Sequence, residues 1–275
     1  MKSNLLFFII SSILSFTLFV SCQKEDDIKP NTNYLKMAEV TTDGSSFKVE
    51  MFAKDSLFVG YNKVYYKVTD MSTGLNVSQA TLVQNPLMDM VTFKHACPVE
   101  NPEANVNDDK YFEGAIIFSM PGSNNSWSLS VDVISAGKTE TAHLAIDKVI
   151  GTSPVQKIVV MDTVITNGVI KVTKFPISFV KPAAWKVGMN KFEITINMMQ
   201  SMMLFPVCED FTVEIIPEMP SMGHGSPNNV NPVCVSKGHY VGSVNFTMTG
   251  DWRINMLIKK SNWVKARKAY FDIIF

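Results

Sequence analysis

Residues 217–225 gather soft metal ligands in a segment that we expect to form no regular secondary structure. They read Pro-Glu-Met-Pro-Ser-Met-Gly-His-Gly, so two thioethers and one imidazole lie within a few positions of each other. The proline and glycine residues indicate a loop. Thioethers select Cu(I), and imidazole binds copper in either oxidation state. The loop therefore predicts Met219, Met222 and His224 as copper ligands. If strand order brings them near, the candidates for a fourth ligand are Met248, His239 and the methionine cluster at residues 198–203.

Similar residue types occur earlier in the chain, at Met88, Met90, His95 and Cys97. A thiolate would strengthen a Cu(I) site, although a free thiol is open to oxidation in an oxidising compartment. A second interpretation needs no metal: methionine and proline side chains cap the open end of a β-sandwich by burying apolar surface, and the histidine hydrogen-bonds a carbonyl. The two interpretations differ in whether the sulfur atoms converge on the imidazole nitrogen or point apart into the core.

The N-terminus has the features of an export signal. Lys2 supplies a positive charge, and residues 5–20 are almost wholly apolar. A run this short is typical of a signal sequence rather than a membrane-spanning helix. Leu-Phe-Val-Ser-Cys at residues 18–22 resembles a lipobox, in which the cysteine is acylated and the chain is cut before it. We therefore expect a signal peptide at residues 1–21 and lipidation of Cys22, which anchors the chain to a membrane.

An acidic cluster, Glu25, Asp26 and Asp27, follows the lipobox. It resembles the export signal of Bacteroidota lipoproteins, which sends them to the outer face of the outer membrane. A charged stretch that also contains Pro30 cannot bury itself, so the same residues equally suit a plain solvated tether. We expect a flexible lipidated tether over residues 22–43 and a chain anchored to the outer membrane, facing the cell surface.

Composition excludes several classes of protein. The mature chain, roughly 250 residues long, has room for one large β-domain or two of ordinary size. The formal net charge is zero and no basic patch is present, so nucleic acid is not an expected partner. We find no glycine-rich phosphate loop, nucleophile elbow or zinc-protease helix motif. With only four histidines as well, the chain is predicted not to be an enzyme.

Three cysteines remain after Cys22. An exported protein meets an oxidising compartment, where disulfides form. Cys208 and Cys234 bracket one loop region and are the natural pair for a disulfide. Cys97 is then left over, either as a buried free thiol or as a metal ligand.

Short runs of alternating apolar and polar residues recur along the chain, for example at residues 64–68, 127–133 and 192–196. Alternation of this kind is typical of half-buried antiparallel strands. Many short strands separated by turn signals predict an all-β chain made of sandwiches.

The chain also matches itself in order, which indicates a duplicated domain. Val-Gly-Tyr-Asn-Lys at residues 59–63 resembles Val-Gly-Met-Asn-Lys at residues 187–191. The later matched pairs are Pro86 and Pro217, Met88 and Met219, Met90 and Met222, His95 and His224, Cys97 and Ser226, Met120 and Met248, and Trp127 and Trp252. We therefore predict two copies of one fold, at residues 44–150 and 151–275.

The second copy carries a recognisable motif. Met-Pro-x-Met-Gly-His, followed by Gly-His-Tyr-x-Gly-x-Val-x-Phe-x-Met-x-Gly-x-Trp, resembles the YtkA-like/FixH-like domain. The resemblance covers residues 165–258 well and residues 47–134 more loosely, because nothing corresponds to Gly223 in the first copy. It implies immunoglobulin-like β-sandwiches in an exported or membrane-attached protein, and several members of the family are linked to copper handling or cytochrome oxidase assembly. At matching positions it implies Met219, Met222, His224 and Met248 as ligands.

Two functions follow as expectations. The first is a surface lipoprotein that binds or relays Cu(I) through the methionine–histidine loops and works with copper-handling proteins. The second is a binding or scaffold module without metal, accessory to a surface transport or adhesion complex. Fold alone does not choose between them.

Overall fold

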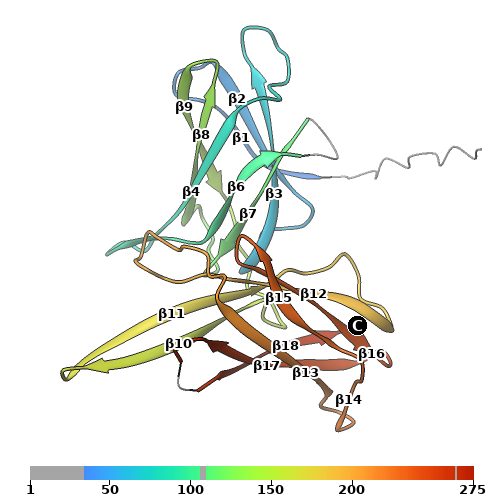
Figure 1. Cartoon of the computed structure of the whole chain (residues 1–275). Helices are drawn as coiled ribbons and strands as arrows, with labels where there is room; N and C mark the ends of the chain where they lie inside the picture. The colour runs from blue at the N-terminus through green and yellow to red at the C-terminus, as the bar shows by residue number, and fades with distance from the viewer. Residues whose placement is uncertain (1–33, 106–109, 264) are drawn as a thin grey trace, which may run out of the picture. The chain divides into compact units, whose positions relative to one another are not determined.

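Burial along the strands follows the alternation in the sequence. Every second residue of β13 (Phe211–Met219) is buried, and β17 (Asp251–Lys260) has a similar pattern. The computed structural model describes residues 34–105, 110–263 and 265–275, and within these ranges the chain forms strands and no helix (Figure 1). Accordingly, no helix long and apolar enough to span a membrane is found in these ranges. The expected signal peptide and Cys22 lie outside the described residues.

The first half of the chain forms two antiparallel sheets that enclose one core. One sheet has the order β1-β2-β3-β7-β6 and the other β5-β4-β8-β9. The strands are β1 (Leu35–Thr41), β2 (Phe47–Ala53), β3 (Gly60–Asp70), β4 (Thr81–Asp89), β5 (Lys94–Ala96), β6 (Val99–Ala104), β7 (Phe112–Phe118), β8 (Trp127–Ser135) and β9 (Lys138–Ile146).

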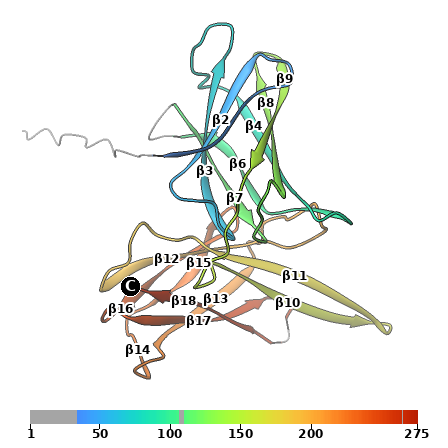
Figure 2. The same cartoon turned by 180° about the vertical axis from the view of Figure 1, so that it is seen from behind.

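The second half repeats this arrangement around a core of its own (Figure 2). Its sheets have the orders β10-β11-β12-β16-β15 and β14-β13-β17-β18, which are the orders of the first half with nine added to each label. The remaining strands are β10 (Lys157–Thr166), β11 (Val169–Phe179), β12 (Gly188–Ile196), β14 (His224–Gly225), β15 (Val230–Ser236), β16 (His239–Phe246) and β18 (Arg267–Ile274). The chain is therefore all-β, with two tandem immunoglobulin-like sandwiches of one topology.

Strand β1 lies inside the range, residues 22–43, that the sequence assigned to a flexible tether. It pairs with β2 from Leu35 to Thr41, so paired structure begins earlier than expected. The charged residues of β1 made this segment resemble a solvated tether in the sequence. In the structure they face solvent or form ion pairs: Lys36 contacts Glu39 and Glu50 at 2.7 and 2.9 Å.

An asparagine holds the same turn in both sandwiches and explains the repeated Gly-x-Asn motif. The amide of Asn62 accepts a hydrogen bond from the Phe58 N–H and donates to the carbonyls of Phe58 and Gly60, at 2.7–2.9 Å. Asn190 makes the corresponding three bonds to Lys186 and Gly188, at 2.7–3.0 Å. Both glycines have φ in the left-handed half of the map, at 127° and 98°, which disfavours other residues there.

Candidate functional site

A histidine, a methionine and a tryptophan lie side by side across one sheet of the first sandwich. His95 on β5 is the register partner of Met88 on β4, and Met88 is also the partner of Trp127 on β8. Direct partners in antiparallel strands leave the sheet on the same face, with Cβ atoms about 5 Å apart. That face is the core face, since the three residues are 6%, 8% and 1% exposed. We call these residues the first row.

The imidazole of the first row is held in a form that suits metal binding. The Nδ1–H of His95 donates to the carbonyl of Ala96 at 2.9 Å, which leaves Nε2 with a free lone pair. Nε2 is buried and has no hydrogen-bond partner within the part of the chain that the structure describes. The ring of Trp127 stands edge-to-face with this imidazole, with ring centroids 5.4 Å apart. A histidine that binds a metal through one nitrogen typically donates from the other in this way.

The second sandwich carries the equivalent residues, which we call the second row: His224 on β14, Met219 on β13 and Trp252 on β17. Met219 and His224 are register partners, and the imidazole and indole centroids are 5.7 Å apart. Nδ1 of His224 is buried and, like Nε2 of His95, has no hydrogen-bond partner in the described ranges. Gly250 allows the row to close, because a Cβ at that position would lie 2.5 Å from Cε of Met219.

Each tryptophan is fixed by a hydrogen bond to the backbone of a matched methionine. The indole N–H of Trp127 donates to the carbonyl of Met120 at 3.1 Å, and that of Trp252 donates to the carbonyl of Met248 at 2.9 Å. The side chain of Met248 itself is 38% exposed. The contact that ties Met248 to the second row is thus made by its carbonyl, whereas the sequence suggested its sulfur.

Met222 does not share the environment of Met219 as the loop spacing had suggested. The N–H groups of Met222 and Gly223 both donate to the carbonyl of Met219, at 3.1 and 2.8 Å, so the chain reverses at once. Met222 lies on the outside of this turn and is 62% exposed, while Met219 is 2% exposed. The exposure of Met222 thus sets it apart from the buried surroundings of Met219, and its role as a ligand stays a prediction. In the first sandwich, Met90 is partly buried against the core beyond the end of β4.

The cysteines behave as thiols of the cores. Cys97 is 4% exposed among the residues of the first core, and burial raises its pKa above the ordinary value, which disfavours the thiolate that a metal needs. Cys208 and Cys234 are both free, so the expected disulfide is not formed. Burial raises the pKa of Cys208 to about 11. The hydroxyl of Tyr240 donates to the carbonyl of Cys208 at 3.0 Å and accepts from the N–H of Phe211 at 3.0 Å.

His239 is not available as a fourth ligand, because two carboxylates occupy its ring. Nδ1 lies 2.7 Å from Glu193 and Nε2 lies 2.7 Å from Glu100, a residue of the first sandwich. Burial disfavours the imidazolium, but the hydrogen bonds to Glu100 and Glu193 outweigh burial and raise the pKa of His239 to about 9. For Glu193, burial is outweighed by His239 and Lys191, which lower its pKa to about 2. The cationic imidazole thus joins carboxylates from both sandwiches.

We expect this contact to make stability depend on pH. The pKa of His239 rises from an ordinary 6.5 to about 9 on folding, so its contribution is complete below pH 6.5 and is lost as the pH rises through 9. The loss should be about 1–3 kcal/mol between pH 7 and 10, after allowance for solvent screening. Urea unfolding across this range checks it. His239→Gln should remove that part of the slope, and a variant with the wild-type slope would contradict the assignment.

The methionine cluster at residues 198–203 lies against both sandwiches. Met199 forms a bridge with Lys174 of β11, and the carbonyl of Met202 accepts a hydrogen bond at 2.9 Å from the N–H of Ala96, next to His95. The cluster therefore approaches the first row through its backbone. The sequence had offered it as a source of a fourth ligand for the second loop.

Harder metal ligands are not grouped. The described residues contain no cluster of three or more histidine, cysteine, aspartate or glutamate side chains that is able to hold a metal ion. Each row contains one imidazole together with a thioether and an indole, and no carboxylate or thiol. Any ion held there must therefore be a soft one.

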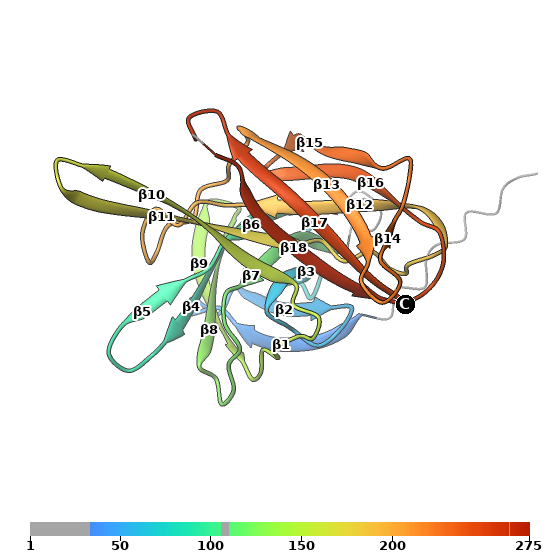
Figure 3. The ribbon, with the colours of Figure 1, turned by 90° about the horizontal axis from the view of Figure 1, so that it is seen from below.

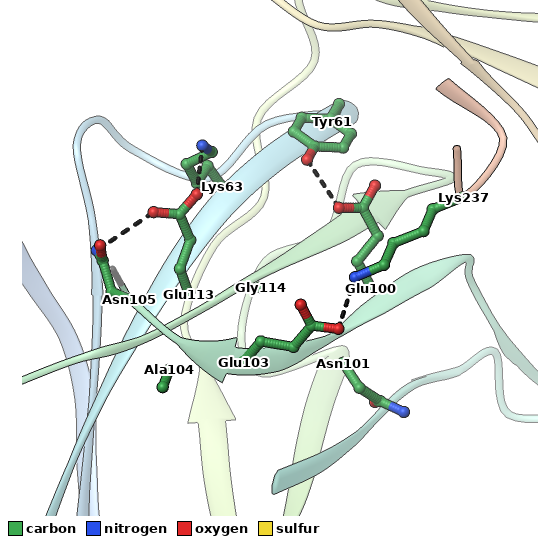
Figure 4. Close-up of a pocket in the computed structure, with 10 residues that line it drawn as sticks. All are labelled: Tyr61, Lys63, Glu100, Asn101, Glu103, Ala104, Asn105, Glu113, Gly114 and Lys237. Atoms are coloured by element: carbon green, nitrogen blue, oxygen red, sulfur yellow. Dashed lines mark hydrogen bonds and ion pairs between the residues drawn. The ribbon is translucent and has the colours of Figure 1, made fainter. Parts of the chain in front are cut away.

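A polar cavity of about 230 Å³ lies beside the His239 contact (Figure 4). Tyr61 points at Glu100 and donates to it at 3.0 Å, and Lys237 pairs with Glu103 at 2.5 Å. Each of the charged residues drawn there already has a partner: Lys63 with Glu113, Lys237 with Glu103, and Glu100 with Tyr61. The sequence contained no motif for this cavity, because residues of β6 and β7 are joined there by Tyr61, Lys63 and Lys237, which are remote from them in sequence.

Comparisons with known proteins leave the function open. No family model matches the chain, and neither does any curated protein. Among solved structures, the chain is similar to the Escherichia coli adhesin FdeC, with 15% identity over 83% of this chain and 65% of the adhesin, at a TM-score of 0.26. It is also similar to a DUF4785 family protein from Legionella pneumophila, with 10% identity over 84% of this chain and 56% of that one, at a TM-score of 0.25. The chain spans less than two thirds of either structure, and the resemblance to the YtkA-like/FixH-like domain stays a prediction.

Proposed function

We propose that the chain is a surface lipoprotein, anchored through Cys22, that binds Cu(I) at the two His–Met–Trp rows and relays it to copper-handling proteins. Each row would supply one thioether, one imidazole nitrogen and the face of one indole. Cu(I) accepts low coordination numbers and prefers soft sulfur and imidazole ligands. An indole face attracts cations. Neither Cys97 nor His239 is needed in this scheme.

The observation that carries the proposal is the pair of unpartnered imidazole nitrogens. Of the four histidines, His143 hydrogen-bonds Ser130 and His239 holds two glutamates. His95 and His224 each keep one buried ring nitrogen without a partner in the described ranges, at equivalent places in the two sandwiches. Leaving a buried polar group unpaired costs about 1–3 kcal/mol. The chain bears this cost in both sandwiches, each time beside a thioether and an indole. A soft cation bound to the lone pair of the imidazole nitrogen would account for it.

Burial also suits the oxidation state. A copper ion in either row would be surrounded by core side chains, since Met88, Met219, Trp127 and Trp252 are at most 8% exposed. Exclusion of water favours Cu(I) over Cu(II), which prefers more and harder ligands.

The proposal is tested by anaerobic Cu(I) competition titration of the chain from Gln23 onward, which retains all the residues that the structure describes. We expect one Cu(I) for each row. His95→Asn should remove the first site and His224→Asn the second, and Met88→Leu or Met219→Leu should weaken the matching site by roughly 10-fold or more.

Matched controls separate the rows from the loop. His143→Asn changes an exposed histidine outside the rows, Met222→Leu changes the exposed thioether of the loop, and Cys97→Ser changes the buried thiol. All three variants should bind Cu(I) as tightly as the unmodified chain. Two results would contradict the proposal: full Cu(I) affinity in the row variants, or no Cu(I) binding by the unmodified chain. The rows would then serve only to pack the cores, and the second function, a scaffold module without metal, would replace the copper proposal.

A further inference from the structure

The hairpin formed by β10 and β11 runs past the strands beside it in its sheet in every view (Figure 1, Figure 2 and Figure 3). The two strands pair over their whole length, and only Ile177–Phe179 of β11 pairs with β12. Asn167 and Gly168 make the turn with φ of 50° and 76°, which is typical of the tight loop that keeps a long hairpin straight. Residues 163–172, which we call the hairpin tip, pair only with each other among the described residues.

The hairpin tip is apolar on both of its faces. Ile165 and Ile170 are register partners on one face and are 68% and 65% exposed. Val164 and Val169 leave the opposite face and are 49% and 67% exposed. Soluble proteins rarely expose a contiguous apolar patch without a partner for it. A flat protein partner would cover one face only, so two apolar faces fit an environment that surrounds the tip.

The charges on the hairpin that have no ion-pair partner among the described residues are positive. Lys171 and Lys174 are exposed, and neither has an ion-pair partner within the described part of the chain. The hairpin's one acidic residue, Asp162, is neutralised by Arg267 at 2.9 Å. A second copy docking tip to tip would bring these lysines together. An anionic partner would be attracted to them instead.

We propose that the hairpin tip inserts into the surface of an anionic lipid bilayer, with Ile165, Val169 and Ile170 below the headgroups and Lys171 and Lys174 at the phosphates. At about 3.4 Å per residue, the tip is about 15 Å long, enough to reach the boundary between headgroups and acyl chains. Its unpaired backbone edges limit it to that hydrated zone, because open sheet edges do not enter hydrocarbon. This site is separate from the copper rows and would orient a chain that Cys22 already holds near a membrane.

The test measures binding of the lipid-free chain from Gln23 onward to vesicles, without copper. We expect binding to vesicles of phosphatidylcholine with phosphatidylglycerol and much weaker binding to phosphatidylcholine alone. Ile165→Ser with Ile170→Ser should weaken binding at least 10-fold, because two exposed aliphatic side chains no longer enter the membrane. Lys171→Gln and Lys174→Gln should each weaken it about 5-fold on the anionic vesicles only.

The matched control is Val230→Ser with Val233→Ser, which removes two similarly exposed aliphatic residues from β15, the strand at the other edge of the same sheet. That variant should bind vesicles as the unmodified chain does, and circular dichroism should show every variant folded. Two results would overturn the proposal. One is equal vesicle binding by the tip variant. The other is no vesicle binding together with a dimer, seen by sedimentation, that the tip variant dissociates; a second copy would then be the occupant.

Discussion

Replacing Trp127 with alanine should lower the free energy of unfolding by ~3–5 kcal/mol, one of the two largest effects we expect in the first sandwich. The indole is 1% exposed and packs edge-to-face against Phe118, with ring centroids 5.1 Å apart, as well as against His95. Its removal leaves a cavity in the core and leaves the carbonyl of Met120 without the indole N–H.

The duplicated fold supplies a matched comparison for this prediction. Trp252 is 1% exposed, donates to the carbonyl of Met248 and packs on Phe246 at 5.2 Å, so Trp252→Ala should destabilise the second sandwich by a similar amount. Chemical unfolding followed by far-ultraviolet circular dichroism measures both losses. Trp127→Phe should recover part of the loss, because the ring fills most of the cavity but restores no N–H. A loss below about 1 kcal/mol for either alanine variant would show that the tryptophan does not hold its core together.

The strand registers around the two tryptophans show which part of the fold the sequence repeat predicted. The order of matched Pro, Met and Trp positions indicated a duplicated all-β domain, and the registers confirm it: Pro86 pairs with Leu129, two residues after Trp127, and Pro217 pairs with Ile254, two residues after Trp252. Such matches work because equal spacing within paired strands produces equal register. The sequence therefore predicted that Met88 and Met219 occupy equivalent places.

Loops were predicted less well, because side-chain direction there depends on single dihedral angles. Val91 and Gly223 both have positive φ, 69° and 64°, and each reverses the chain after its methionine. Residue order alone does not reveal such a reversal, so Met222 was grouped with Met219 although the two face different surroundings. The His239 contact was missed for another reason: Glu100 and Glu193 lie far from it in sequence and form no motif.

A buried polar network in the first sandwich was equally invisible, and it carries the second large prediction. Gln84 on β4 is 1% exposed and accepts a hydrogen bond from the hydroxyl of Tyr66 at 2.7 Å. Its Nε2 donates to the carbonyls of Glu100 and Ala115, at 2.5 and 2.8 Å. Strand β4 belongs to one sheet and these three partners to the other, so a single amide ties the two sheets together. The second sandwich has isoleucine at both matching positions, Ile215 for Gln84 and Ile194 for Tyr66.

Gln84→Leu should therefore destabilise the chain by about 3–5 kcal/mol, because it removes three buried hydrogen bonds and leaves the hydroxyl of Tyr66 without the amide oxygen. Tyr66→Phe alone should cost about 1–2 kcal/mol, since the amide keeps its two backbone bonds. In the double variant the cost should be less than the sum of the two, because no tyrosine hydroxyl is then left unpaired.

Gln79→Leu, a change of the same type on the surface, should shift stability by no more than about 0.5 kcal/mol. Urea unfolding of the four variants measures these differences. If the two losses of stability instead add up fully in the double variant, Tyr66 and Gln84 act independently, and the prediction of a coupled network is wrong.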